Sequence, residues 1–175
     1  ILRKSSFNMN DELLDVVDAD DRVIGQKLRS QLYAEFSCNF RVINAFLVNS
    51  RGQLWIPRRT ASKKIFPFCL DMSCGGHVMS GESYEEALRR EVLEELNLDT
   101  RKSPTRLLGY LSPFTDGVSV FMKVYEIRQD ESPKWHPEDF VEAFWLYPHE
   151  ILERVQAGVP AKPDLKKLVG LFYLP

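Results

Sequence analysis

The sequence predicts an α/β (α+β) fold in which a mixed β-sheet lies between helices, preceded by a small N-terminal β-hairpin. Three observations support this prediction. An apolar, β-prone run at 41–48 (RVINAFLV) is followed by several shorter strand-like runs. One helix with clear start and stop signals lies between the strands, from Ser83 to about Leu96. Two more helical patterns come near the end of the chain, and this alternation is typical of layered α/β folds.

Two hairpins are predicted in the first third of the chain, because in each case two β-prone runs flank a short turn-forming segment. The first turn is DADD at 18–21, and the second is NSRG at 49–52. The segment 31–36 between the hairpins fits either a helical turn or a connection. The predicted strands here are 13–17, 22–26, 41–48 and 53–56.

Beyond the central helix, loop signals separate the remaining elements. The segment SPFTDG at 112–117 divides two strands, and a polar, proline-containing connection at 128–139 precedes the last strand. Pro148 suits the first turn of a helix that ends before Gly158, and an amphipathic helix follows. The predicted elements are strands in part of 66–73 and at 107–111, 118–127 and 140–146, with helices at 148–157 and 164–172.

The composition indicates one domain, 11–175, behind an N-terminal segment, 1–10, that we expect to be disordered or left over from recombinant expression. A net charge of −2 without basic runs gives no indication of nucleic-acid or membrane binding, and no stretch of 18 apolar residues occurs. The cysteines Cys38, Cys69 and Cys74 are odd in number and lack metal-site spacing, which favours a reduced, cytoplasmic setting. Monomer and homodimer both remain open.

The stretch GGHVMSGESYEEALRREVLEELNL carries the main chemical signal. It begins with Gly75 and Gly76, which favour a loop with close backbone approach. Ser83 followed three residues later by Glu86 is a capping-box signature for a helix start. Asn97 tolerates the left-handed conformation that ends a helix. The stretch therefore predicts a glycine loop followed directly by a helix.

Helical spacing places acidic residues beside the buried face of this helix. Leu88, Val92 and Leu96 share one apolar stripe. A second set, at i, i+3 and i+4, covers the adjacent arc, although like charges at this spacing are mildly destabilising. Such clustering suggests a hard divalent cation, because carboxylate oxygens suit Mg²⁺. The acidic set is Glu91, Glu94 and Glu95.

A surface helix offers a simpler explanation of the same glutamates. Many exposed helices are rich in Glu, and Arg90 lies four residues from both Glu86 and Glu94. It could therefore form ordinary i, i+4 ion pairs on a solvated face. The three glutamates alone do not separate these two interpretations.

The longer spacing does separate them, because it resembles the Nudix box, G-x5-E-x7-R-E-U-x-E-E-x-G-U, in which U is a bulky apolar residue. Gly76, Glu82 and Arg90 open the match, and eight of the nine specified positions agree. Asn97 replaces the last glycine. Since both residues tolerate the left-handed helix end, the departure is mild.

The resemblance extends over most of the chain. The stretch NAFLVNSRGQLWIPRRTASKKIFPFCLDMSCGGHVMSGE is similar to the isopentenyl-diphosphate-isomerase-like branch of the Nudix superfamily, in particular its bacterial, MutT-like hydrolases. This resemblance implies an α/β/α sandwich. It also implies a cytoplasmic hydrolase that cleaves a pyrophosphate bond in a nucleoside diphosphate-linked substrate, with nucleoside di- or triphosphates as first candidates.

The resemblance also implies a metal site that uses Mg²⁺, with Mn²⁺ as a substitute. Glu91 and Glu95 would be direct ligands and Glu94 a co-ligand. Glu82 would bind directly or through water, and the Gly75 carbonyl would add a backbone oxygen. These oxygen donors match what Mg²⁺ prefers.

The general base is less determined by the resemblance. It is either a glutamate of the box, Glu91 or Glu94, or one on a later strand, where Glu142 is the candidate. Arg90 would orient a glutamate rather than touch the substrate. The alternatives are an outward-facing strand residue for Glu142 and a simple loop-to-helix ion pair for Glu82 with Arg90.

Substrate-binding side chains are expected from the basic loop after the second hairpin. Arginine gives bidentate phosphate contacts and lysine a point charge, although a solvated basic loop would look the same. Phe114, Trp55 and Phe66 could stack on a base, although aromatic residues more often lie in the core. The phosphate candidates are Arg58, Arg59, Lys63 and Lys64.

Two other functions remain as alternatives. An isopentenyl-diphosphate isomerase would use a Cys and a metal bound largely by histidines, which Cys74 and His77 invite. If His77 is aligned with the family histidine, however, the family Cys falls on Gly75, and no histidine lies upstream. Cys74 is then a small packed residue. A non-catalytic nucleotide-binding module is the other alternative, but such domains tend to lose the box glutamates.

Overall fold

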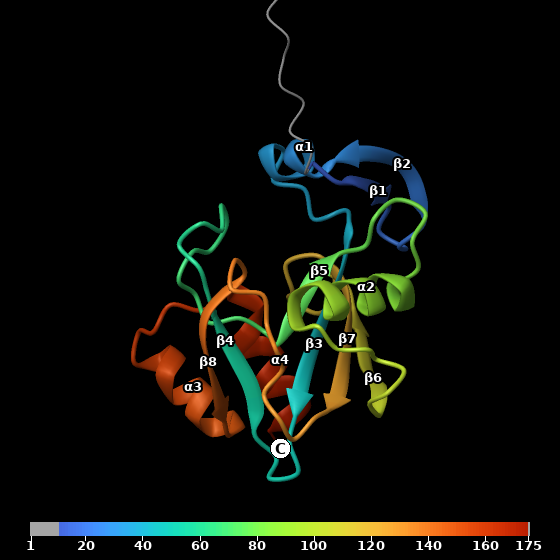
Figure 1. Ribbon diagram of the computed structural model, residues 1–175. Helices are drawn as coiled ribbons and strands as arrows, with labels where there is room; N and C mark the ends of the chain where they lie inside the picture. Colours follow the sequence, from blue (N-terminus) through green and yellow to red (C-terminus); the bar gives the residue numbers. More distant parts are fainter. Residues whose placement is uncertain (1–10, 175) are drawn as a thin grey trace, which may run out of the picture.

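A mixed six-stranded sheet with helices on both faces forms the body of the molecule (Figure 1). The structure is a computed structural model that describes residues 11–174, so the expectation for 1–10 lies outside the described residues. The expected sandwich, mixed sheet and N-terminal hairpin are confirmed. The elements are β1 (Leu13–Val17), β2 (Val23–Leu28), α1 (Arg29–Ala34), β3 (Arg41–Val48), β4 (Leu54–Arg59), β5 (Cys74–His77), α2 (Tyr84–Leu96), β6 (Thr105–Leu111), β7 (Phe121–Arg128), β8 (Phe140–Leu146), α3 (Pro148–Gln156) and α4 (Pro163–Tyr173).

Strand β3 is the centre of the sheet, whose order is β6-β7-β3-β4-β8. It runs parallel to β7 along its whole length. On its other side it pairs antiparallel with β5 over Val42–Ala45 and with β4 only at Val48. The predicted β3–β4 hairpin therefore exists, but its strands pair only beside the turn, because β5 occupies the rest of that edge.

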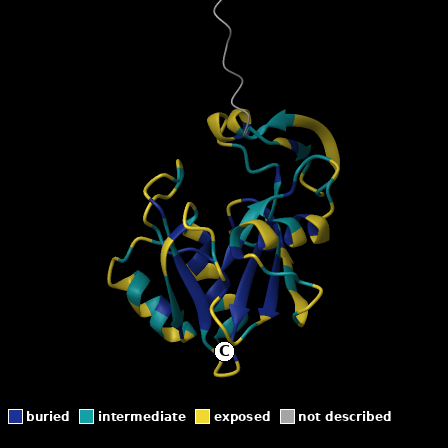
Figure 2. Cartoon of the chain, in the orientation of Figure 1, coloured by how far each residue is buried: buried dark blue, intermediate teal, exposed yellow. Residues whose placement is uncertain are grey.

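Both faces of β3 are buried, which explains its continuous apolar sequence. Ile43, Ala45 and Leu47 belong to the core under α2, whereas Phe46 and Val48 belong to the core on the opposite side, under α4. Figure 1 shows α2 in front of the sheet and α4 behind it, and Figure 2 shows the central strands buried and the outer helix surfaces exposed. Successive strand residues face opposite sides, so a doubly covered strand needs apolar residues throughout.

Helix α2 begins and ends as its sequence predicts. The Ser83 side chain accepts a hydrogen bond from the Glu86 N–H, and the Glu86 carboxylate bonds back to Ser83. Asn97 ends the helix with φ 53° and ψ 35°, in the left-handed region. Leu88 and Val92 are buried against the sheet. Local signals therefore determine the helix on which the acidic residues lie.

Three local predictions differ from the structure. Arg58 and Arg59 lie in strand β4 rather than in the predicted basic loop, because β4 continues to pair with β8 as far as Arg59. Gly75 and Gly76 lie in strand β5 rather than in a loop, because each pairs with β3. No strand forms within 66–73, where Leu70 makes only isolated bridges. The close approach expected of the glycines is nevertheless correct. Within residues 11–174, no helix is long and apolar enough to cross a membrane.

Candidate active site

Helix α2 lies directly against the glycine pair of β5. A Cβ atom built on Gly76 would overlap the carboxylate of Glu91. One strand residue earlier, the Gly75 N–H donates to Glu95 Oε2 at 3.3 Å. Packing therefore requires glycine at position 76, since any larger side chain there would displace Glu91.

Arg90 joins the carboxylates into one cluster. Its Nε and Nη2 donate to the two oxygens of Glu82, each at 2.8 Å, and Nη2 also donates to the His77 carbonyl at 2.9 Å. Its Nη1 donates to Glu91 Oε1 at 2.5 Å, while Glu94 lies farther away at 3.5 Å. The bond to Glu82 raises the pKa of Arg90 further above its usual range. Arg90 thus fixes the loop glutamate and one helix glutamate together, as expected of an orienting residue.

Glu91 and Glu95 are costly to keep in their charged form. Burial raises the pKa of Glu91 to about 7, against the opposing effect of Arg90. Burial also raises the pKa of Glu95 to about 8, and the charges of Glu91 and Asp71 add to this. A divalent cation beside them would offset this cost, because opposite charge stabilises the ionised form.

The donor set fits a hard divalent cation. Glu91 and Glu95 offer carboxylate oxygens next to backbone atoms of β5, and Glu94 extends from the same helix with a side chain that is 60% exposed. Within residues 11–174, these groups are held by Arg90 and Gly75 rather than gathered in threes around one point. Oxygen donors of this kind suit Mg²⁺ or Mn²⁺.

Cys74 and His77 occupy structural positions beside this cluster. Cys74 is fully buried, as expected, and burial raises the pKa of its thiol well above the usual value; the thiol contacts Glu95. His77 Nε2 lies 3.0 Å from the Tyr33 hydroxyl, and its Nδ1 lies 3.1 Å from Glu12 Oε2. Its ring therefore ties the N-terminal hairpin and α1 to β5.

Arg58 and Arg59, at the end of strand β4, point to protein partners. Arg58 Nε donates to Glu142 Oε1 at 2.6 Å, across the β4–β8 pair. Arg59 Nη1 donates to Asp71 Oδ2 at 2.7 Å, and the Asp71 side chain is almost fully buried. The predicted base Glu142 thus faces an arginine on a neighbouring strand, where its side chain is about half exposed.

The other predicted substrate residues lie at the periphery. Lys63 forms an ion pair with Asp139, whereas Lys64 is exposed. Phe114 lies in the β6–β7 loop, with its ring 5.7 Å from that of Phe121. Their roles as phosphate and base contacts remain predictions.

Two acidic residues near the site were missed by sequence reasoning. Asp71 is 3% exposed, and Arg59 and Lys162 both pair with it. Glu12 is held by His77 and Arg29. Burial alone would raise the pKa of Glu12, but these two partners outweigh burial and lower it. No local motif marks either residue, because each reaches the site only through pairing between distant segments.

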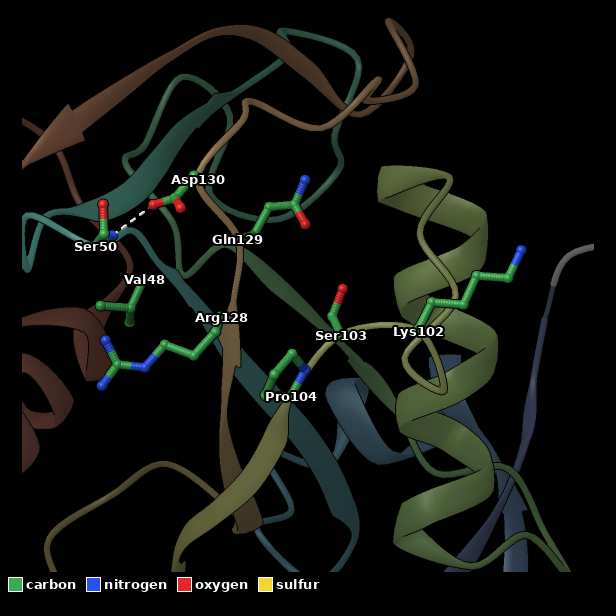
Figure 3. Close-up of a pocket in the computed structure, with 8 residues that line it drawn as sticks. All are labelled: Val48, Ser50, Lys102, Ser103, Pro104, Arg128, Gln129 and Asp130. Atoms are coloured by element: carbon green, nitrogen blue, oxygen red, sulfur yellow. Dashed lines mark hydrogen bonds between the residues drawn. The ribbon is translucent and has the colours of Figure 1, made fainter.

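A hollow of 390 Å³ lies away from the carboxylates, at the end of β3 beyond Val48. Figure 3 shows that the Lys102 and Arg128 side chains point in different directions rather than into a shared centre. Arg128 is also 2.9 Å from Glu126. This hollow therefore lacks converging chemical groups, in contrast to the junction of α2 and β5.

Comparison with known proteins gives a consistent result. Residues 39–167 match the NUDIX domain family. The chain is 61% identical to an uncharacterized Nudix hydrolase of Nostoc, over 93% of this chain and 96% of that protein. It superposes on the crystal structure of DR0079 from Deinococcus radiodurans with a TM-score of 0.90 and 50% identity, covering 93% of this chain and 99% of that one. An isopentenyl-diphosphate Delta-isomerase of Kocuria rhizophila is 24% identical over 87% of each chain.

Proposed function

The chain belongs to the Nudix hydrolase family, whose members act on pyrophosphate bonds and generally use divalent metal ions, and we propose that it is a Mg²⁺-dependent hydrolase of a nucleoside diphosphate-linked compound. Nucleoside di- and triphosphates are the first substrates to test. In this proposal residues 11–175 form a single enzyme domain.

One observation carries this proposal: the carboxylates of buried Glu91 and partly buried Glu95 face a strand that has no side chains at the point of contact. Glu91 and Glu95 lie against Gly76 and Gly75, and burial raises the pKa of both acids. Folding stability alone gives no reason to bury two like charges together. A bound cation does, because opposite charge stabilises the ionised carboxylates.

We assign metal binding to Glu91 and Glu95, with Glu94, Glu82 and the Gly75 carbonyl as further donors. These residues would hold Mg²⁺, which when bound would neutralise phosphate oxygens and lower the pKa of a water molecule. Arg90 keeps its role as the orienting residue.

The general base is assigned to Glu94 in preference to Glu142. Glu94 is exposed and its nearest cation, Arg90, is at 3.5 Å, so its carboxylate can accept a proton from water. Glu142 is instead engaged by Arg58 at 2.6 Å. We assign phosphate binding to Lys64, which is exposed, and to its neighbour Lys63, which pairs with Asp139.

The test is the release of phosphate and pyrophosphate from nucleoside di- and triphosphates, nucleotide sugars and dinucleoside polyphosphates. Wild type, Glu94→Gln and Glu95→Gln are compared with Mg²⁺ and with chelator, and Glu153→Gln on exposed α3 is the matched control. Metal-dependent turnover in wild type and control, but not in the two site variants, would support the proposal. A folded wild type that releases product from none of these compounds would refute it, and isopentenyl diphosphate would then be the next substrate.

A further inference from the structure

The β4–β5 connection forms an arm, residues 57–71, whose base is firmly held. The Arg59 N–H donates to the Cys69 carbonyl and the Asp71 N–H to the Pro57 carbonyl, each at 3.0 Å. These bonds pair the two limbs of the arm in antiparallel fashion. The arm is therefore an ordered extension of β4 rather than a loose basic loop.

Two phenylalanines at the tip of this arm adopt an unfavourable backbone conformation. Phe66 has φ 53° and Phe68 has φ 60°, in the left-handed region that bulky residues avoid. Their side chains also remain 40% and 53% exposed. Such conformations are strained for bulky side chains, and glycine or asparagine would relieve the strain. Folding stability thus does not explain two exposed aromatic rings at these positions.

Both neighbouring arginines hold the backbone of these phenylalanines. Arg58 Nη1 donates to the Phe68 carbonyl at 3.2 Å. Arg59 Nε donates to the Phe66 carbonyl at 3.1 Å, and its Nη2 to the Ile65 carbonyl at 3.0 Å. Every carbonyl in this set lies next to or within the strained segment. The guanidinium groups therefore act as clamps that fix where the two rings stand.

Each of the two arginines also forms an ion pair with a carboxylate. Glu142 holds Arg58, and the buried Asp71 holds Arg59. Arg59 thus joins the Phe66 carbonyl to Asp71, which lies three residues before the start of β5.

The arm is also tied to helix α2. Lys63 pairs with Asp139 beside the start of β8. The Asp139 N–H donates to the His136 carbonyl at 2.9 Å, and the His136 N–H donates to the Glu95 carbonyl at 2.8 Å. Polar contacts therefore link Lys63 of the arm to the helix that carries the box glutamates.

We propose that Phe66 and Phe68 are the specificity-determining residues that stack on a planar ring of the substrate, the base of a nucleoside diphosphate, and that Arg58 and Arg59 are positioning residues for them. This inference rests on the proposed hydrolase function and deepens it. Aromatic rings tolerate any base, because every base has a π-face. The arm would thus select for a ring-bearing diphosphate over one without a ring.

The first test compares a nucleoside diphosphate with a base-free diphosphate, methyl diphosphate, in the same variants. Phe66→Leu and Phe68→Leu keep apolar bulk but remove the ring, and Phe66→Trp and Phe68→Trp keep a ring. We expect the Leu variants to raise KM for the nucleoside diphosphate roughly 10-fold, with little change in kcat and no change for methyl diphosphate. The Trp variants should retain the wild-type KM. Equal KM changes for both compounds, or none, would overturn the inference.

The arginines are tested separately, because a phosphate contact would behave differently. Arg58→Met removes the clamp on Phe68 and should raise KM for the nucleoside diphosphate alone. A direct phosphate contact would raise KM for both diphosphates and would be partly rescued in Arg58→Lys. That pattern would overturn the positioning role. Thermal unfolding of each variant checks that the arm variants remain folded.

Binding without turnover distinguishes failure of this inference from failure of the hydrolase proposal. The uncleavable α,β-methylene analogue of the nucleoside diphosphate and methylenediphosphonate are titrated calorimetrically into wild type and the double variant F66L/F68L, with Mg²⁺. Weaker binding of the nucleotide analogue only would support the stacking role even if no hydrolysis were found. Equal affinities in wild type and double variant would refute it, even for an active hydrolase.

Discussion

The α2–β5 junction and the arm each carry a cluster of like charges in the sequence, but the charged side chains have different surroundings in the folded protein. At the junction, the carboxylates of Glu91 and Glu95 remain gathered at a glycine-lined surface. On the arm, Arg58 and Arg59 turn toward protein carbonyls and acids. Charges that the fold leaves without enough opposite charge indicate a ligand, whereas charges matched by partners indicate architecture.

The sharpest way to break this comparison is to remove charge at the junction. Glu95→Gln or Glu91→Gln should lower kcat by roughly 10²–10³-fold or more, because a metal carboxylate contributes most in the transition state. Steady-state hydrolysis with saturating Mg²⁺ measures this, and Glu153→Gln should keep the wild-type rate. Near-normal rates in both site variants would show that the buried carboxylates are not the metal ligands.

Alanine substitutions at two glycines test whether close packing at the junction matters as much as its charge. Gly76→Ala would push a Cβ into the Glu91 carboxylate and should cost about 1–3 kcal/mol of stability together with most of the activity. Gly170→Ala is the matched change in α4, where a Cβ meets nothing within 4 Å; it should stabilise the protein by about 0.5–1 kcal/mol. Chemical denaturation and turnover are measured for both. Equal effects of the two substitutions would contradict the packing argument.

Arg90→Lys tests the link between the loop and helix glutamates. Lysine keeps the charge but cannot bond both oxygens of Glu82, so kcat/KM should fall about 10–100-fold with the fold unchanged. Arg89→Lys, the neighbouring exposed arginine, should behave as wild type. A wild-type rate in Arg90→Lys would mean that charge alone is sufficient at this position.

The stability of the chelator-treated protein sharpens the comparison further. Burial raises the pKa of Glu95 to about 8 from 4.5, so the folded protein keeps this proton more firmly than the unfolded chain. Its favourable contribution is present below about pH 4.5 and is lost as pH rises to about 8. The stability of Glu95→Gln relative to wild type should therefore rise between pH 5 and pH 8, by roughly 3–4 kcal/mol. Denaturant midpoints at pH 5 and pH 8 measure this, and a constant difference would contradict it.

The smallest expected effect concerns the end of α2. Asn97 departs from the Nudix pattern but already adopts φ 53°. Asn97→Gly should change stability by no more than about 0.5 kcal/mol, whereas Asn97→Ala should cost about 1 kcal/mol because alanine disfavours this conformation. Thermal unfolding resolves the two. A large loss in Asn97→Gly would indicate that the Asn side chain has a separate role.

Local spacing was sufficient to predict the helix, its caps and the set of glutamates on one face. The start at Ser83 and the end at Asn97 depend on contacts within one helical turn, so the sequence determines them directly. The apolar run at 41–48 likewise predicts a strand, and β3 forms there. The acidic helix and this strand follow from local signals, whereas the family and the α/β/α sandwich follow from the resemblance of 76–98 to the Nudix box.

Only the tertiary structure decided which side chains and which strands pair with one another. Arg58 and Glu142 are 84 residues apart and meet because β4 pairs with β8. Gly75 and Gly76 became strand rather than loop because β4 pairs with β3 only at Val48, which leaves the edge of β3 at 42–45 free for β5. Pairing between strands distant in the chain depends on the register of the whole sheet, and no window of the sequence contains that information.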